Sequence, residues 1–294
     1  MSALAKKLQA GKFVITGELT PPKGTDISEL QARARSLAGC LDAFNFTDSH
    51  ASKMSLSAIA AARLLLDDGI EPILQLTTRD RNRIALQGDM LGAWLLGIQN
   101  LVCMGGDPPH LGDHPEAKPV FDLSTEELIC AAGKLNAGTD FMDNPLNQGT
   151  AFNIGAVVNP GADDLDGEIA RLETKVAAGA LFFQTQAIYD ADHFTNFMER
   201  ISHLDIAILA GIMPIKSVAM ARFMNEKIPG ITIPEELIQR IAGATDIAAE
   251  STQIAVEIIQ RIKSQCQGLH IMALGWEDKI PGIIEQANLD RGCL

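Results

Sequence analysis

Cysteine pairs, histidine pairs and long apolar runs are all missing from this chain of 294 residues. Its cysteines form no CxxC pair and its six histidines show neither HxH nor HExxH spacing, so we expect no metal site within the chain. The cysteines are widely spaced: Cys40, Cys103, Cys130, Cys266 and Cys293. We expect reduced thiols at these positions, because disulfides are rare in a reducing compartment.

Basic residues are scarce, and so are the signals that direct a chain to a membrane. There are 24 Lys and Arg against 37 Asp and Glu, and the formal net charge of -13 argues against a nucleic-acid partner. No apolar run reaches the ~18 residues that cross a bilayer, and residues 1–13 lack the apolar segment of a signal peptide. We therefore predict a cytoplasmic protein with no membrane span.

Three catalytic motifs are absent as well, namely GxSxG, the Walker pattern and GxGxxG, which weakens a hydrolase or nucleotide-kinase assignment. Apolar residues, in contrast, are plentiful. They make up 47% of the chain, against 21% charged residues, so we expect a compact globular fold with a large core.

Short apolar runs alternate with longer segments whose apolar residues recur at spacings of three and four, as in amphipathic helices. The runs predict strands at Phe13–Leu19, Ala43–Thr47, Pro72–Thr77, Leu101–Met104, Phe152–Val158, Leu181–Gln186, Ile206–Met213 and Leu269–Leu274. The segments between them predict helices at Ile27–Leu37, Ser55–Leu66, Ile84–Leu96, Thr125–Leu135, Leu165–Ala178, Ala191–Ile201 and Val218–Asn225, with a long helical stretch from Pro234 to Gln265. Strict alternation of eight such units predicts an α/β fold, a single-domain (β/α)8 TIM barrel over residues 1–294.

Active sites of such barrels lie at the C-terminal ends of the strands. The polar residues that close the apolar runs are Glu18, Thr47, Asp48, Gln75, Thr77, Thr78, Asp107, Asn159, Gln184 and Gln186. The segment 107–124, which is rich in Pro, Gly and His, follows the fourth strand, and we expect it to lie over the mouth of the barrel. Loops of that length are usually functional.

Glu18 is the best catalytic candidate. It closes the run FVITGEL and is followed by Thr20, Pro21 and Pro22, which fix a rigid turn behind it. Apolar walls would partly desolvate the carboxyl group, and we expect a raised pKa that suits a general acid. From its position alone, Glu18 could instead be a surface glutamate without a catalytic role, or one that accepts a hydrogen bond from a loop amide.

Other candidates are suited to binding. Gly105 and Gly106 allow the backbone to approach a planar or phosphorylated ligand, and Asp107 can then hydrogen-bond to it, although a plain Gly-Asp-Pro turn is the alternative. The amides of Gln184 and Gln186 suit the edge of a pterin or a flavin. Lys175, on the preceding helix, is within reach of a cofactor phosphate, whereas a lysine at such a position is usually solvated.

Taken in order, these residues resemble the methylenetetrahydrofolate reductase family from about residue 13 to about residue 287. The matching fragments are GELTPP (17–22), NFTDS (45–49), QLTTRD (75–80), MGGDPP (104–109), KVAAGALFFQTQAIYD (175–190) and GIMPI (211–215). Each fragment is weak alone, but their order and their places on successive strands are fairly specific.

The resemblance implies a flavoprotein that reduces 5,10-methylenetetrahydrofolate to 5-methyltetrahydrofolate. Glu18 would protonate a folate nitrogen, and reduced flavin would deliver hydride from N5. Asp107 would stabilise the cationic intermediate, while Gln186, with Gln184, would bind the folate. The residues implied to hold the flavin are Thr47, Gln75, Met104, Gly105, Gly106, Asn159 and Lys175.

Several positions depart from the family pattern. Gln75 replaces a common histidine, Gly105 an arginine that contacts the flavin, Asn159 a common tyrosine, and GADD (161–164) a family HPEA segment. After GIMP, the sequence IKSVAMARF lacks the aromatic residue that packs on nicotinamide in well-known bacterial members. The chain here resembles the short reductases of anaerobes and acetogens.

These departures bear on the cofactor and the electron donor. We expect FAD from the resemblance, with FMN as the alternative, and electrons from an iron-sulfur or zinc-containing partner subunit instead of directly from NAD(P)H. We also expect an oligomer. Two other functions stay open: a pterin-binding methyltransferase that uses folate without flavin, and a non-catalytic subunit that binds folate or flavin. Fold alone does not choose among them.

Overall fold

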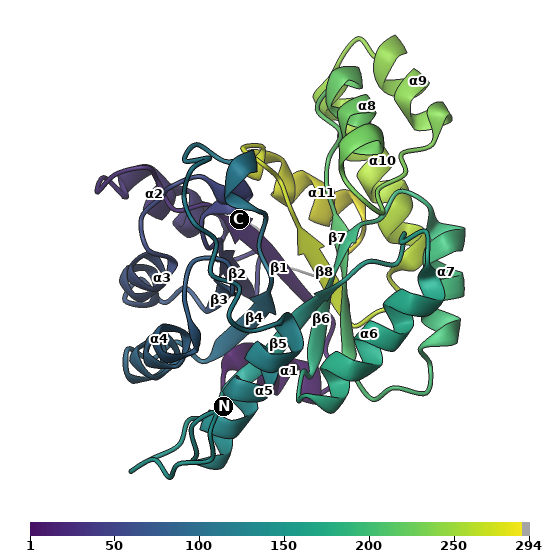
Figure 1. Ribbon diagram of the computed structural model, residues 1–294. Helices are drawn as coiled ribbons and strands as arrows, with labels where there is room; N and C mark the ends of the chain where they lie inside the picture. The colour runs from purple at the N-terminus through teal and green to yellow at the C-terminus, as the bar shows by residue number, and fades with distance from the viewer. Residues whose placement is uncertain (290–294) are drawn as a thin grey trace.

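Parallel strands close into a barrel in the computed structural model, which describes residues 1–289 (Figure 1). Each strand pairs with the next one in sequence, and the last strand pairs with the first. The strands are β1 (Val14–Leu19), β2 (Ala43–Phe46), β3 (Pro72–Thr77), β4 (Asn100–Met104), β5 (Asn153–Val158), β6 (Phe182–Ala187), β7 (Ala207–Ile212) and β8 (Gly268–Ile271). The predicted (β/α)8 fold is confirmed, and each predicted strand is present.

Helices follow the strands and form an outer ring around the barrel (Figure 1). They are α2 (Ser28–Leu37), α3 (Ala58–Leu66), α4 (Arg83–Leu95), α5 (Thr125–Ala137), α6 (Leu165–Ala177), α7 (Ala191–Arg200), α8 (Val218–Lys227), α9 (Glu235–Gly243) and α10 (Ile247–Ile262). Elements that the sequence pattern did not predict are α1 (Ala3–Gln9), α11 (Ile280–Gln286) and the 3-10 turns η1 (His50–Ser52), η2 (Pro109–Leu111) and η3 (Glu277–Lys279). Within residues 1–289 no helix has both the length and the apolar character of a bilayer span.

The stretch from Pro234 to Gln265, predicted as one long helical stretch, consists of two helices. The prediction is wrong for the residues between them. The α9 helix ends at Gly243, and Ala244 has an extended backbone with ψ of 132°. Asp246 then starts α10, because its carboxylate accepts a hydrogen bond from the amide of Ala249 at 3.0 Å. An aspartate at this position satisfies an amide that the first helical turn leaves free. In Figure 1, α8 and α9 project beyond the barrel.

Side chains at alternate strand positions fill the barrel in layers. The layer nearest the N-terminal ends of the strands is apolar and consists of Val14, Ala43, Ile73, Val102, Phe182 and Leu209. Phe182 takes the space that a side chain on β5 would need, since a Cβ added to Gly155 would lie 2.4 Å from its ring. The next layer is polar, and its buried members are Thr16, Asn45, Gln75, Gln184 and His270. We call these five residues the polar layer.

The α1 helix closes the N-terminal end of the barrel. Its Leu4 is fully buried against the apolar layer. Ser2 caps the helix by accepting a hydrogen bond from the amide of Ala5, and its hydroxyl donates to Asn100 on β4 at 2.7 Å. Glu71 accepts a hydrogen bond from the amide of Ala3 at 3.0 Å, which ties the helix to the start of β3. The barrel interior is therefore sealed at this end.

One expectation about the cysteines is wrong. Cys103, Cys130 and Cys266 are free thiols, and burial raises the pKa of Cys103 to about 12 and that of Cys266 to about 11. Cys40, however, is disulfide-bonded. Cys293 lies outside the described residues.

We expect Leu4→Ala to lower the free energy of unfolding by about 2–5 kcal/mol, because it removes buried apolar volume from the closed end of the barrel. Urea denaturation of the two proteins measures this difference. Leu95→Ala is the control, since Leu95 is 86% exposed and its loss should change stability by less than about 0.5 kcal/mol. Equal effects of the two substitutions would refute a sealing role for α1.

Candidate functional site

Glu18 points into the barrel near the C-terminal end of β1, and its side chain is 12% exposed. The amide nitrogen Nε2 of Gln75, on β3, donates a hydrogen bond to Glu18 Oε2 at 3.1 Å. The Nε2 atom of His270, on β8, lies 3.8 Å from the same oxygen. Side chains from β3 and β8 thus approach the carboxylate of Glu18 on β1.

The pKa of Glu18 is lowered, so the predicted rise is wrong. Burial is the largest single influence, and it does raise the pKa as expected. The interaction with the His270 ring, its positive charge, the charge of His50 and the hydrogen bond from Gln75 all lower it, and together they outweigh burial. The sequence argument counted desolvation alone, because nothing in the chain order places His270 beside Glu18.

The polar layer beneath Glu18 is hydrogen-bonded throughout. The side chain of Asn45 donates to Gln184 Oε1 at 2.6 Å, and Gln184 Nε2 donates back to Asn45 Oδ1 at 2.9 Å. Gln184 Nε2 also reaches Thr16 Oγ1 at 3.5 Å, and His270 Nδ1 lies 3.0 Å from that hydroxyl. Gln184, predicted to bind folate, therefore has both of its amide atoms engaged within the barrel.

Sequence reasoning missed Thr16, Asn45 and His270. Each lies in the middle of an apolar run, where a single polar residue gives no indication of a functional site. The available signal is the two-residue period of a strand, which puts Thr16 on the same face as Glu18. Asn45 likewise shares a face with Thr47.

The hydroxyl of Thr47 is buried and has no hydrogen-bond partner among the described residues. Its neighbour Asp48, in contrast, has several partners for one carboxylate oxygen. Asp48 Oδ2 accepts from the Thr77 amide at 2.9 Å and from the Thr77 hydroxyl at 2.8 Å, and it pairs with Arg81. An unsatisfied buried hydroxyl is uncommon in proteins, and a bound ligand is one explanation.

Met104 ends β4, and the loop that follows carries Gly105, Gly106 and Asp107. Gly106 has φ of +88°, and a Cβ there would lie 3.0 Å from Thr77 Cβ, so the turn requires glycine. A Cβ on Gly105 would have only one neighbour within 4 Å, the hydroxyl of Thr125 at 3.7 Å, which leaves this backbone accessible. Met104 is half-buried, and the Asp107 carboxylate is exposed.

Arg79 connects the loops that follow β2, β3 and β4. Its buried guanidinium donates to the hydroxyl of Ser52 at 3.1 Å and to the carbonyl of Asp107 at 3.4 Å. The Ser52 hydroxyl donates to that same carbonyl. The backbone at Ser52 has φ of +56°, a left-handed conformation that costs energy in a non-glycine residue. These contacts fix the loop that presents Asp107.

Segment 107–124 crosses the loops after β1, β2 and β3. Asp113 pairs with Lys23 and accepts a hydrogen bond from the Met54 amide at 2.9 Å. The hydrogen bond from Lys23, followed by that from Met54, holds the pKa of Asp113 well below its usual range. The amide of Val120 donates to the Arg79 carbonyl at 2.7 Å. The segment therefore lies at the C-terminal end of the barrel, as expected.

Gln186 lies where the pairing of β6 with β7 shifts register, and its Oε1 accepts a hydrogen bond from the amide of Ala187 at 3.0 Å. Asn159 follows β5, and its amide donates to the Pro229 carbonyl at 3.1 Å. The Asn159 side chain also accepts from the Gly161 amide at 3.2 Å. Asn159 thus ties two loops together.

Lys175 is buried, so it is not the solvated lysine usual at such a position. Its ammonium group donates to the Val157 carbonyl at 2.8 Å. Burial lowers the pKa of Lys175, while the charges of Glu168 and Glu126 act in the opposite direction. The side chain of Val157 itself is 36% exposed. Its neighbours Ala156 and Val158 face the outer helices, so Val157 faces the inside of the barrel.

The structure places nine of the predicted residues in three groups, while Thr47 and Gln186 lie after β2 and on β6. Glu18 and Gln75 contact each other inside the barrel, and Gln184 lies in the polar layer with Gln75. Met104, at the end of β4, and Gly105, Gly106 and Asp107, on the loop after it, lie close to Thr77. Asn159 and Lys175 lie at β5, which is across the barrel from β1. Among residues 1–289 no group of three or more His, Cys, Asp or Glu side chains is placed to hold a metal ion.

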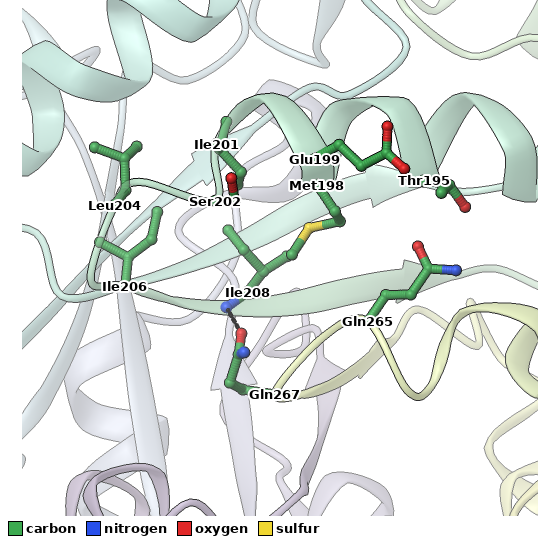
Figure 2. A pocket seen from close by; sticks show the side chains of 10 residues that line it. All are labelled: Thr195, Met198, Glu199, Ile201, Ser202, Leu204, Ile206, Ile208, Gln265 and Gln267. Carbon is green, nitrogen blue, oxygen red and sulfur yellow. Dashed lines mark hydrogen bonds between the residues drawn. The ribbon is translucent and has the colours of Figure 1, made fainter.

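A cavity of about 420 Å³ lies at the other end of the barrel, beside α7 and the start of β7 (Figure 2). Met198 and Ile208 line it, and Gln267 accepts a hydrogen bond from the Ile208 amide at 2.8 Å. Glu199 is the one ionisable side chain in its lining. The cavity lacks the acid–base groups gathered at Glu18, so we place the functional site at the C-terminal ends of the strands.

The fold and this arrangement define a (β/α)8 barrel whose site is built on strand ends and the loops after them, as in barrel enzymes generally. A sequence profile of methylenetetrahydrofolate reductase matches residues 3–288. The chain belongs to the methylenetetrahydrofolate reductase family. The resemblance drawn from the sequence fragments is confirmed.

Several relatives are similar over much of the chain. Methylenetetrahydrofolate reductase 2 of Saccharomyces cerevisiae is 25% identical over 254 residues, which cover 81% of this chain and 40% of the relative. Methylenetetrahydrofolate reductase 2 of Schizosaccharomyces pombe is 24% identical over 305 residues, covering 97% and 47%. The 5,10-methylenetetrahydrofolate reductase of Salmonella typhimurium is 27% identical over 169 residues, covering 55% and 51%. The chain spans about half or less of the length of these relatives.

Solved structures show the same fold. An uncharacterized protein from Clostridium thermocellum, described as binding two copies of 5-methyl-5,6,7,8-tetrahydrofolic acid, matches with a TM-score of 0.63 and 18% identity over 97% of each chain. A 2,3-dimethylmalate lyase matches with a TM-score of 0.53 and 11% identity, over 98% of this chain and 86% of the lyase. At these identities the likeness concerns the fold alone.

We expect Thr47→Val to raise the free energy of unfolding by about 1 kcal/mol, because an unsatisfied buried hydroxyl costs about 1–3 kcal/mol. Thr77→Val is the matched control. It removes a hydrogen bond to the Asp48 carboxylate and should destabilise the protein by about 1.5–3 kcal/mol. Thermal or urea unfolding of the original protein and the two variants measures these changes in stability. A loss of stability in both variants would show that the Thr47 hydroxyl has a hydrogen-bond partner.

Proposed function

We propose that this protein reduces 5,10-methylenetetrahydrofolate to 5-methyltetrahydrofolate with a flavin as its resident cofactor. The observation that carries the proposal is the carboxylate of Glu18, which ends the first strand of a family-matched barrel and contacts Gln75 and His270. The description of the Clostridium thermocellum neighbour as a methyltetrahydrofolate-binding protein supports folate as the ligand.

The residues at the strand ends fit a flavin. The unpartnered hydroxyl of Thr47 offers a hydrogen bond, and the accessible backbone at Gly105 leaves room for a planar ring. Gly106 keeps the loop close to β3, and Met104 and Val157 add exposed or half-buried apolar surface. When bound, reduced flavin supplies the hydride for the reaction.

Lys175 is suited to the phosphate end of the cofactor. Among residues 1–289 it makes one hydrogen bond, to the Val157 carbonyl, and an ammonium group has three donors. Its burial makes pairing with an anion favourable, because the charge is otherwise poorly solvated. We propose FAD as the cofactor on the family resemblance, with Gln75 and Asn159 as further contacts.

Glu18 is proposed to protonate a folate nitrogen as the methylene bridge opens. Its lowered pKa keeps the carboxylate charged, so the proton must move onto it during binding. Burial is already the largest influence on this pKa, and a pterin covering the exposed part of the side chain would increase that influence. Substrate binding itself therefore favours the acid form of Glu18.

Asp107 and Gln186 are proposed to hold and stabilise the folate. The Asp107 carboxylate is exposed on a loop fixed by Arg79 and Ser52, so it can face a cationic intermediate without large rearrangement. Gln186 is half-buried on β6, two positions beyond Gln184 of the polar layer. Gln184 would act from below, through its contacts with Asn45 and Thr16.

The electron donor is proposed to be a partner subunit. After β7 the stretch IKSVAMARF (215–223) lacks the aromatic residue that packs against nicotinamide in well-known bacterial members, and its first residue, Ile215, is buried. Lys216 instead lies 5.3 Å from the ring of Trp276, in the loop after β8. A partner that carries an iron-sulfur cluster or zinc would take over the role of the nicotinamide.

Reconstitution with FAD is expected to give a yellow protein that reduces methylenetetrahydrofolate with an artificial reductant and only slowly with NADH or NADPH. Visible absorption, the mass of the extracted cofactor and single-turnover assays measure these properties. Preferential retention of FMN would correct the cofactor. Rapid turnover with NADH alone would refute the partner donor, and absence of flavin binding would favour the methyltransferase alternative.

Glu18→Gln is expected to lower the rate of folate reduction by about 10²–10⁴-fold, because it removes the general acid but keeps the shape of the side chain. Flavin affinity should stay within about twofold, since the substitution leaves the proposed flavin contacts in place. Glu173→Gln, at an exposed glutamate on α6, is the control and should be as active as the original protein. Full activity of Glu18→Gln would rule out the acid role.

A further inference from the structure

The cavity beside α7 has an aliphatic end and a polar end (Figure 2). Its volume of about 420 Å³ lies in the range that small-molecule sites occupy. The aliphatic end, on the left of Figure 2, is formed by Ile201, Leu204 and Ile206. The polar end, on the right, is formed by Thr195, Glu199 and Gln265. A molecule that fits this cavity therefore needs a hydrocarbon part and a polar head group.

The uncharged groups at the polar end accept hydrogen bonds. The Thr195 hydroxyl donates its single hydrogen to the Ala191 carbonyl at 2.8 Å, so its oxygen is left to accept. Gln265 Nε2 donates to the Arg261 carbonyl at 3.1 Å, which fixes the orientation of the amide. Gln265 Oε1 is buried and has no hydrogen-bond partner among residues 1–289. Buried acceptors without a donor are uncommon, and a ligand that donates a hydrogen bond is one way to satisfy this oxygen.

The carboxylate of Glu199 gives the polar end a negative charge. Arg200, the next residue along α7, pairs with Asp166, and Arg261 on α10 pairs with Asp192. Within residues 1–289 Glu199 itself forms no ion pair. The α7 helix ends at Arg200, and the C-terminal end of a helix carries a partial negative charge. The polar end is thus electronegative and suits a cation.

No basic side chain offsets this charge within the cavity. Among the described residues, its lining contains no lysine, arginine or histidine. Ser202 and Gln267, its other polar residues, are neutral, and Gln267 Oε1 already accepts a hydrogen bond from the Ile208 amide at 2.8 Å. An anionic head group would meet Glu199 without a compensating charge, so the cavity disfavours anions.

We propose that this cavity is a second ligand site, which binds a small primary amine as its ammonium ion. An ammonium group has three N–H donors and no acceptor, which matches a polar end built from acceptors. The N–H groups donate to Glu199, Thr195 and Gln265, while the hydrocarbon chain packs against the aliphatic end. Alkyl amines titrate like lysine, with a pKa of about 10, so they are charged at neutral pH.

This site is separate from the one proposed for folate and flavin, and the inference does not depend on that function. Ile208 lies near the beginning of β7, whereas Glu18 lies near the C-terminal end of β1. Parallel strands put these ends on opposite sides of the barrel. An amine bound beside α7 therefore leaves the mouth of the barrel open.

Two kinds of interaction hold the ammonium group, and they respond differently to salt. Glu199 is exposed, so dissolved ions screen its attraction for the ligand. Water does not contact Gln265 Oε1, so little competes with a ligand that donates to this oxygen. Reaching it takes a small rotation of the half-buried side chain, and such rotations are common on binding. Salt should therefore weaken the binding of an amine without abolishing it.

The first test follows the methyl signals of carbon-13-labelled methionines as hexylammonium chloride is added. Met198 lines the cavity, and its signal is identified from Met198→Leu. That signal should shift until the site is saturated, whereas the signal of Met142, which is 67% exposed outside the cavity, should not. Hexanol and hexanoate have the same chain length but no positive charge, and they should bind about tenfold more weakly or not at all.

The second test uses variants of the polar end. Glu199→Gln should weaken hexylammonium binding about fivefold, because it removes the charge and keeps the shape of the side chain. Gln265→Leu, which removes the buried acceptor, should also weaken binding. Glu226→Gln, at an exposed glutamate on α8, is the matched control and should bind hexylammonium as the original protein does.

The absence of a saturable shift of the Met198 signal would overturn the proposal. Equal affinities for hexylammonium, hexanol and hexanoate would overturn it as well, because the cavity would then select for the hydrocarbon chain alone. Unchanged affinity in both Glu199→Gln and Gln265→Leu would have the same result.

Discussion

The hydrogen-bonded polar layer inside the barrel is the constraint on which the rest of the site depends. Buried polar groups are costly unless they are paired, so Thr16, Asn45, Gln184 and His270 hold one another in fixed orientations. Glu18 lies directly above them, and the combined influence of His270, His50 and Gln75 lowers its pKa by more than burial raises it. The apolar layer and α1 below keep water from entering at the other end.

The loops above this layer are fixed by a different means. Arg79 and Ser52 link three successive loops through the carbonyl of Asp107, and Asp113 ties the long segment after β4 to Lys23. The candidate cofactor residues on the β4 loop are therefore presented by a braced framework, while the candidate acid belongs to the rigid strands. The strands thus carry the candidate acid, and the braced loops carry the candidate binding residues.

Much of this could be predicted from sequence, because strand runs and helix periods are local features. The runs ending in Glu18 and Gln75 located the strand ends, and alternation gave the barrel. The break between α9 and α10 was missed, since an internal aspartate cap looks like any other helix residue until its partner amide is known. The sign of the Glu18 pKa shift was missed for a different reason: it depends on His270, and that contact arises only when β8 pairs with β1.

That pairing has a consequence for biosynthesis. Chains emerge from the ribosome N-terminus first, so Glu18 is among the first residues made, while His270 arrives near the end. Until β8 docks, the edge of β1 is open and the carboxyl group lacks its imidazole neighbour. Closure of the sheet and the approach of His270 to Glu18 are the same event, so an unfinished or truncated barrel lacks this pair of side chains.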